Sequence, residues 1–111
     1  MNKPLLLVVE DDAAVRSLIS TTLKTEGYRF HTAATGNQAL IEAVSQNPDI
    51  IILDLGLPDM DGIDIIKNVR SWSKMPIIVV SARCDDEDKI EALDNGADDY
   101  VTKPFGVMEL I

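Results

Sequence analysis

The sequence has few cysteines, few aromatic residues and little positive charge. Its 111 residues include one cysteine, Cys84, so no disulfide can form within the chain. Lys and Arg number 10 against 19 Asp and Glu, which gives a formal net charge of -9. Because such a field repels phosphate backbones and anionic lipids, this stretch alone is a poor candidate for binding nucleic acid or a membrane surface.

Long hydrophobic runs are also absent. The N-terminal segment MNKPLLLVVEDD contains an apolar run too short for a signal peptide or a membrane span. Together with the lone cysteine, this predicts a cytoplasmic protein. The composition is otherwise that of a globular protein, 46% hydrophobic and 26% charged, and the length suits one domain over residues 1–111.

Five short segments have the composition of β-strands. Four of them do not alternate with polar residues, which is typical of strands buried on both faces of a parallel sheet. The segment Arg29–Ala33 does alternate, which suits a less enclosed edge strand. The four continuous runs are Leu5–Val9, Ile50–Leu53, Ile77–Val80 and Tyr100–Thr102.

Segments with helical spacing of apolar residues separate these strands. The first begins after Asp12, a predicted N-cap, and stops at Gly27. The last has only Ile90, Ala92 and Leu93 as apolar anchors, which predicts a loosely held helix. The alternation of strands and helices predicts an α/β fold with right-handed crossovers. The other helical segments are Gly36–Gln46, Gly62–Trp72 and Asp85–Asn95.

Polar residues follow the strands at the edge of the sheet where ligands bind in such folds. They are Glu10, Asp11, Asp54, Ser81 and Lys103. Two carboxylates about 4 Å apart repel by roughly 4 kcal/mol at an effective dielectric constant of about 20, so gathering three of them requires a cation. Oxygen ligands favour Mg²⁺, Mn²⁺ or Ca²⁺, and Mg²⁺ in particular is usually held by one or two carboxylates together with water and a phosphate. The sequence therefore predicts a divalent metal site at this edge.

Four other polar or aromatic residues are interpreted as structural. Asp12 is assigned to capping the helix, and Trp72 to packing. His31 falls in the expected edge strand, where a solvated or packed histidine is the commoner case. Cys84 precedes two acids, a setting that raises a thiol pKa, so it is not a candidate nucleophile.

Four short motifs, in order and at the right spacing, resemble those of receiver domains of two-component response regulators. They are LLVVEDD (6–12), LDLGLPDMDG (53–62), PIIVVSA (76–82) and GADDY with KPF (96–105). The similarity covers nearly the whole chain. The second motif, with residues 81–83 and 103–107, is most like the OmpR/PhoB class, and within it the Kdp-type regulators of potassium transport genes.

The resemblance implies a flavodoxin-like (CheY-like) five-stranded parallel sheet of order 2-1-3-4-5, with helices on both faces. It implies that Asp54 accepts a phosphoryl group from a phosphohistidine of a sensor histidine kinase. Asp11, Asp54 and the backbone carbonyl of Gly56 would hold Mg²⁺, with Mn²⁺ as a substitute, and Glu10 would reach the ion through water. Lys103 would neutralise phosphoryl charge, and Ser81 would hydrogen-bond the new phosphoryl group.

The family also implies a switch and an output. Phosphorylation would draw the Ser81 hydroxyl inward, and the Tyr100 ring would follow. The reshaped face would form a homodimer, and an attached winged-helix domain would bind DNA. That domain is expected beyond residue 111, because only Gly106–Ile111 represent a truncated fifth helix. The dimer-face charges would be Lys89, Asp98, Asp99 and Glu109.

The sequence departs from the family at two positions and leaves other functions open. Glu10 stands where Asp is commoner, and Ser81 replaces a common Thr. The domain is expected to signal rather than act as an enzyme, catalysing only its own phosphorylation and dephosphorylation. The alternatives are a stand-alone receiver that docks to a partner, an aspartyl-nucleophile phosphatase and a flavin or nucleotide binder. Gly56 stands where such a phosphatase carries its general acid, and the first loop's acids would repel a cofactor phosphate.

Overall fold

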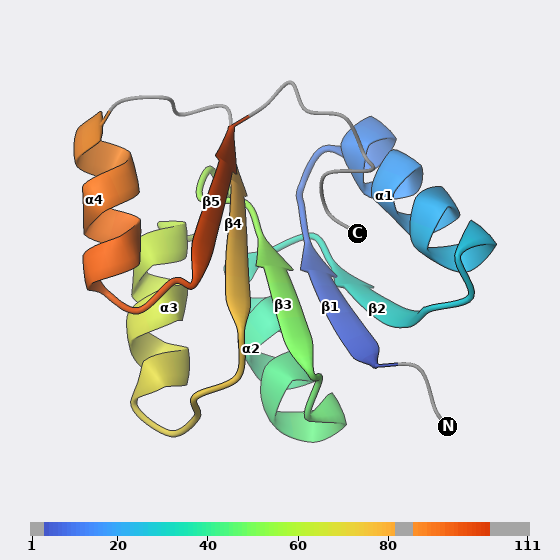
Figure 1. Cartoon of the computed structure of the whole chain (residues 1–111), viewed down its shortest axis with the longest axis horizontal. Helices are drawn as coiled ribbons and strands as arrows, with labels where there is room; N and C mark the ends of the chain where they lie inside the picture. The colour runs from blue at the N-terminus through green and yellow to red at the C-terminus, as the bar shows by residue number, and fades with distance from the viewer. Residues whose placement is uncertain (1–3, 82–85, 103–111) are drawn as a thin grey trace.

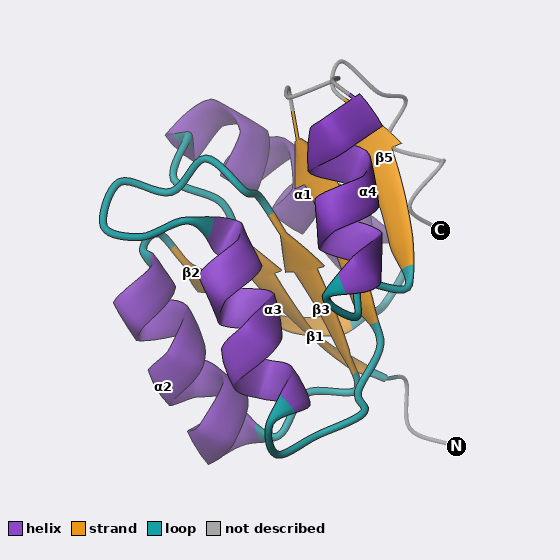
Figure 2. Ribbon diagram, turned by 90° about the vertical axis from the view of Figure 1, so that its left-hand side faces the viewer, coloured by secondary structure: helices purple, strands orange, loops and turns teal. Residues whose placement is uncertain are grey.

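A five-stranded parallel sheet covered by helices on both faces forms the body of the protein (Figures 1 and 2). The computed structural model describes residues 4–81 and 86–102. The strands lie in the order β2-β1-β3-β4-β5, which confirms the order implied by the resemblance. The expected remnant of a fifth helix lies outside the described residues. The elements are β1 (Leu5–Val9), α1 (Ala13–Thr25), β2 (Arg29–Ala33), α2 (Gly36–Gln46), β3 (Ile50–Leu53), α3 (Gly62–Arg70), β4 (Ile77–Ser81), α4 (Asp86–Asp94) and β5 (Asp99–Thr102).

The strand side chains alternate between two cores, one on each face of the sheet. Leu7 and Val9 of β1 point into the larger core, with α2, α3 and α4, whereas Leu6 and Val8 point into the smaller core with α1. Both faces of β1 are therefore buried, as its continuous apolar run predicts. The strand β2 alternates between exposed and half-buried positions before the buried Ala33, and it lies at the end of the strand order, which confirms its assignment as an edge strand.

The third and fourth helices differ in detail from the prediction. The third ends at Arg70 rather than Trp72, because the N–H groups of Ser71 and Trp72 turn back to carbonyls three residues earlier and tighten the last turn. In α4, Ala92 is buried, but Ile90 is 57% exposed and Leu93 39% exposed. These two side chains do not anchor the helix as expected, so α4 is held to the core by even less apolar surface. None of the helices in the described ranges is long and apolar enough to cross a membrane.

Candidate functional site

The register of the two central strands places Glu10 and Asp54 side by side. Val9, the last residue of β1, pairs with Leu53, the last residue of β3. The Asp54 N–H donates a hydrogen bond to the Val9 carbonyl at 2.9 Å, and the Glu10 N–H donates to the Ala33 carbonyl at 3.0 Å. The ladder therefore continues one residue past each strand and fixes the backbone that carries both acids.

Three carboxylates meet at this point. Each of Glu10, Asp11 and Asp54 offers an oxygen, and the three oxygens lie within 4.8 Å of one another. Glu10 is 2% exposed and Asp54 8% exposed, whereas Asp11 is open to solvent. The structure thus brings together the three acids that the sequence predicts as a metal site. Burying carboxylates this close is unfavourable without a compensating cation or hydrogen bonds.

The β1–α1 turn is fixed by its own side chains. Asp12 accepts hydrogen bonds from the N–H groups of Ala14 (2.9 Å) and Val15 (3.2 Å), which confirms it as the N-cap of α1. Glu10 accepts from the Asp12 N–H at 3.3 Å. Arg16 donates to the main-chain carbonyls of Glu10 at 2.9 Å and Asp11 at 3.4 Å. The backbone that presents the two acids is therefore held from the first turn of the helix.

The β3–α3 loop orients Asp54. The Gly56 N–H donates to Asp54 Oδ1 at 3.2 Å, so one carboxylate oxygen is fixed by the loop itself. Asp61 is the N-cap of α3 and accepts from the Ile63 N–H at 2.9 Å. The Gly62 N–H donates to the Leu55 carbonyl at 3.0 Å. The loop thus returns to its own start beside the acid it carries.

Of the two other residues predicted to contact the phosphoryl group, Ser81 and Lys103, the structure describes only the backbone of Ser81. Ser81 is the last residue of β4 and pairs with Thr102 of β5, which puts its backbone at the same edge of the sheet as Asp54. Lys103 lies outside the described residues. The Tyr100 side chain is buried at 8% exposure in the core on the α4 side of the sheet, so the described conformation has the aromatic inward.

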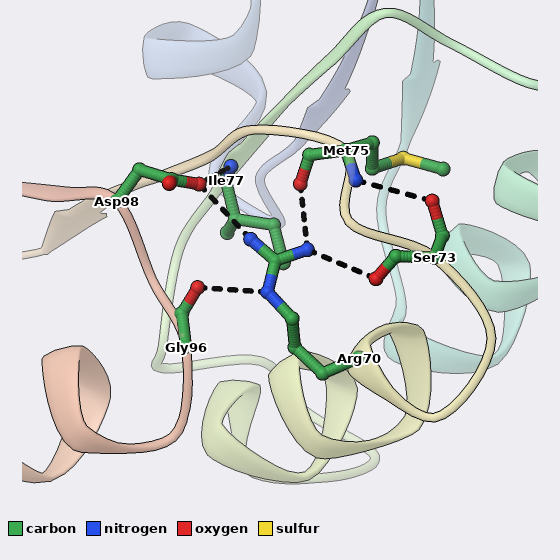
Figure 3. Close-up of polar contacts among 6 residues, drawn as sticks. All are labelled: Arg70, Ser73, Met75, Ile77, Gly96 and Asp98. Atoms are coloured by element: carbon green, nitrogen blue, oxygen red, sulfur yellow. Dashed lines mark hydrogen bonds and ion pairs between the residues drawn. The ribbon is translucent and has the colours of Figure 1, made fainter.

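Three of the four predicted dimer-face charges lie among the described residues, on α4 and around the start of β5. Lys89, Asp98 and Asp99 are exposed, and Glu109 lies outside the described residues. Asp98 is bound within its own chain, because its Oδ2 accepts from the Ile77 N–H at 2.8 Å and from the Arg70 guanidinium at 2.9 Å (Figure 3). If Asp98 contacts a partner, its carboxylate is already held in one orientation by these two hydrogen bonds.

Two of the residues interpreted as structural, His31 and Trp72, are not members of the cluster of Glu10, Asp11 and Asp54. His31 is exposed on the edge strand β2, and Trp72 follows α3, where its indole N–H donates to Asn68 Oδ1 at 3.2 Å. Cys84 lies outside the described residues.

Several residues that hold loops and the ends of helices in place are not predicted from the sequence. Arg16, Asp59, Asp61 and Arg70 all bind backbone groups near strand ends or helix ends. Asp61 carries a detectable signal, since an Asp directly before a helical run has the same pattern that identifies Asp12. Asp59 bonds Gly36 and Asn37, and Arg70 bonds Gly96 and Asp98 besides nearer carbonyls. These named partners lie more than 20 residues away, and no local pattern marks them.

Sequence comparison places the chain in a known family. The model of the response regulator receiver domain matches residues 6–111. The KDP operon transcriptional regulatory protein KdpE of Escherichia coli is 53% identical over 105 residues, covering 95% of this chain and 47% of that protein. Transcriptional regulatory protein KdpE of Mycobacterium tuberculosis is 50% identical over 107 residues, covering 96% and 47%. The chain spans about half the length of these curated relatives.

Solved structures agree with the fold. The Francisella response regulator 1452 receiver domain superimposes with a TM-score of 0.93 at 38% identity, covering 98% of this chain and 91% of that one. The chemotaxis response regulator CheY4 of Vibrio cholerae gives a TM-score of 0.91 at 34% identity, covering 98% and 93%. The acids at the ends of β1 and β3 therefore sit on a scaffold shared with response regulators.

Proposed function

The chain belongs to the response regulator receiver domain family, and on that premise we propose that Asp54 accepts a phosphoryl group from a phosphohistidine of a sensor histidine kinase. The observation that carries this proposal is the meeting of Glu10, Asp11 and Asp54 at the ends of two adjacent strands. Asp54 directly follows the central strand β3, and one of its oxygens is oriented by the Gly56 N–H.

The three acids fit a divalent ion. They supply hard oxygen donors, two of them buried, at separations that only a cation or hydrogen-bond donors can stabilise. Asp11, Asp54 and the Gly56 carbonyl would hold Mg²⁺ or Mn²⁺, and Glu10 would reach it through water. When bound, the ion supplies charge neutralisation for the transferring phosphoryl oxygens.

Asp54 acts as the nucleophile in the transfer. A carboxylate oxygen attacks phosphorus, the O–P bond of an acyl phosphate forms, and the N–P bond of the phosphohistidine breaks. The electron pair of that bond stays on the imidazole nitrogen, which then takes a proton from water. Lys103 would pair with the phosphoryl oxygens, and the Ser81 hydroxyl would hydrogen-bond the product.

The response to phosphorylation would involve the part of the sheet beyond β3, which is formed by β4 and β5. On phosphorylation, Ser81 and Tyr100 would couple the new group to the packing of β5 and α4. The small buried apolar surface of α4, where Ile90 and Leu93 are exposed, supports this helix as the element that shifts. The reshaped face would then form a homodimer through Lys89, Asp98, Asp99 and Glu109.

A winged-helix DNA-binding domain would follow residue 111 in the intact protein. The KdpE relatives, which are about twice as long as this chain, support that reading over a stand-alone receiver. The net charge of -9 supports binding of DNA through the attached domain rather than through this one.

Acetyl phosphate tests the proposal without the kinase. Incubation with Mg²⁺ should add one phosphoryl group per chain in intact-mass spectrometry, and removal of Mg²⁺ with a chelator should abolish the adduct. Asp54→Asn should gain none. An adduct of undiminished yield in that variant would overturn the assignment.

A further inference from the structure

The β3–α3 loop is closed at its base. An isolated antiparallel bridge pairs Gly56 with Asp61, and the Gly62 N–H returns to the Leu55 carbonyl. Residues 57–60 form the tip of this closed loop. Gly56 therefore sits at the neck, next to the acid whose oxygen its N–H orients.

The tip of the loop is bound to a different element of the fold. Asp59 Oδ1 accepts from the Gly36 N–H at 2.7 Å, and its Oδ2 accepts from the Asn37 N–H at 2.9 Å. These are the first two N–H groups of α2, which have no partner within the helix. The hydrogen bonds from Asn37 and Gly36 lower the pKa of Asp59 below its ordinary value of 3.8. An added Cβ at Gly36 would overlap the Met60 side chain, so tip and helix are in close contact.

The helix has a local cap besides this long-range one. Thr35 is the N-cap of α2, and its hydroxyl accepts from the Gln38 N–H at 3.2 Å. Asp59 binds different donors and joins segments 22 and 23 residues apart. Its hydrogen bonds connect the loop that follows Asp54 to the start of a helix packed on the sheet.

We propose that Asp59 is a positioning residue for phosphoryl transfer: it fixes the tip of the β3–α3 loop on α2 and thereby holds Gly56 in register with Asp54. This inference rests on the proposed function. Gly56 is exposed and has no side chain to hold it, so its place depends on the bridge to Asp61 at the neck and on Asp59 at the tip. Loss of this tether, the two hydrogen bonds from α2 to Asp59, would let the Gly56 N–H and carbonyl shift together.

The test measures Mg²⁺ affinity by isothermal titration calorimetry and the rate of phosphorylation by acetyl phosphate. Asp59→Ala should weaken Mg²⁺ binding about three- to tenfold and should slow phosphorylation. This loss of affinity is at or below the one usually measured when a residue that hydrogen-bonds a metal ligand is replaced. Asp59→Asn should recover part of both, because its amide oxygen still accepts hydrogen bonds. Thr35→Ala is the matched control. It removes a cap from the same helix end and should keep Mg²⁺ affinity within about twofold of the parent, since the loop tether remains.

Three results would overturn the positioning role. In the first, Asp59→Ala matches the parent in Mg²⁺ affinity and phosphorylation rate. In the second, Asp59→Asn loses as much as Asp59→Ala, which would reveal an effect of charge alone. In the third, Thr35→Ala weakens Mg²⁺ binding as much as Asp59→Ala does. In each case the parent still binds Mg²⁺ and gains a phosphoryl group, so the proposed function stands. A parent that does neither refutes the proposed function itself, and the positioning role falls with it.

Discussion

Arg70 and Asp98, 28 residues apart, form an ion pair in which Arg70 Nη2 lies 2.9 Å from Asp98 Oδ2 (Figure 3). The same guanidinium donates to the carbonyls of Gly96 at 2.9 Å and Met75 at 2.6 Å. The end of α3, the approach to β4 and the turn after α4 are therefore held by one side chain. Since only 20% of the Arg70 side chain is exposed, its loss would leave these acceptors poorly satisfied.

Replacing this arginine should destabilise the fold. Arg70→Ala is expected to lower the free energy of unfolding by about 2–3 kcal/mol, because several charge-assisted hydrogen bonds are lost together. Arg70→Lys should recover only a part, since an ammonium cannot reproduce the planar fork of donors. Urea denaturation measures both, with exposed Lys74→Ala as the control. Equal stability of the parent and Arg70→Ala would show that the network is dispensable.

Removing one acid should separate metal binding from stability. In the parent, Mg²⁺ at ten times its dissociation constant should stabilise the fold by about 1.4 kcal/mol and raise the Tm by several degrees. Asp11→Ala should lose most of this shift while raising the Tm without metal, because one repelling charge is gone. Differential scanning calorimetry with and without Mg²⁺ measures both effects.

Asp12→Ala is the matched control for Asp11. It removes the N-cap of α1 and should lower stability by about 1 kcal/mol, yet it should keep the Mg²⁺ shift. If Asp11→Ala responded to Mg²⁺ as strongly as Asp12→Ala, Asp11 would not be a ligand.

Gly56 in the β3–α3 loop and Gly62, the first residue of α3, should differ in their tolerance of a side chain. A Cβ at Gly62 would lie 2.7 Å from the Leu55 Cα and 3.0 Å from the Asp54 carbonyl oxygen, backbone atoms that cannot rotate away. Gly62→Ala should therefore lower stability by about 1–3 kcal/mol. At Gly56 the nearest atom is Asp54 Oδ1 at 3.9 Å, so Gly56→Ala should stay within about 0.5 kcal/mol of the parent. Equal losses in urea denaturation would contradict this account of the loop.

Acid should weaken the tether between Asp59 and α2. The folded-state pKa of Asp59 is below its ordinary value of 3.8, so its contribution to stability is complete above that value and is lost as the pH falls through the folded pKa. Asp59→Asn cannot titrate, and its Tm should fall less steeply than that of the parent below about pH 4. Parallel Tm profiles of the two proteins between pH 6 and pH 2 would refute the shift.

The sequence predicts those features that depend on local pattern or on strand pairing. Four apolar runs and one alternating segment identify the five strands, and acids directly after β1 and β3 must meet once these strands lie side by side. Asp12 is predictable as a cap because its partners are two and three residues away. Asp59 and Arg70 escape prediction for the opposite reason, since each bonds backbone groups that only the folded chain brings near. The exposure of Ile90 and Leu93 likewise depends on how α4 packs, which spacing alone does not determine.

Chemical mapping of the phosphorylated residue tests the central claim most directly. Borohydride reduces the acyl phosphate of an aspartate to homoserine, so the protein can be treated with acetyl phosphate and Mg²⁺, reduced, digested and sequenced by tandem mass spectrometry. The account predicts homoserine at position 54 and at no other aspartate, with none formed when Mg²⁺ is withheld. Homoserine at Asp11 or Asp12, or a phosphoryl group retained on His31 with position 54 unchanged, would contradict it.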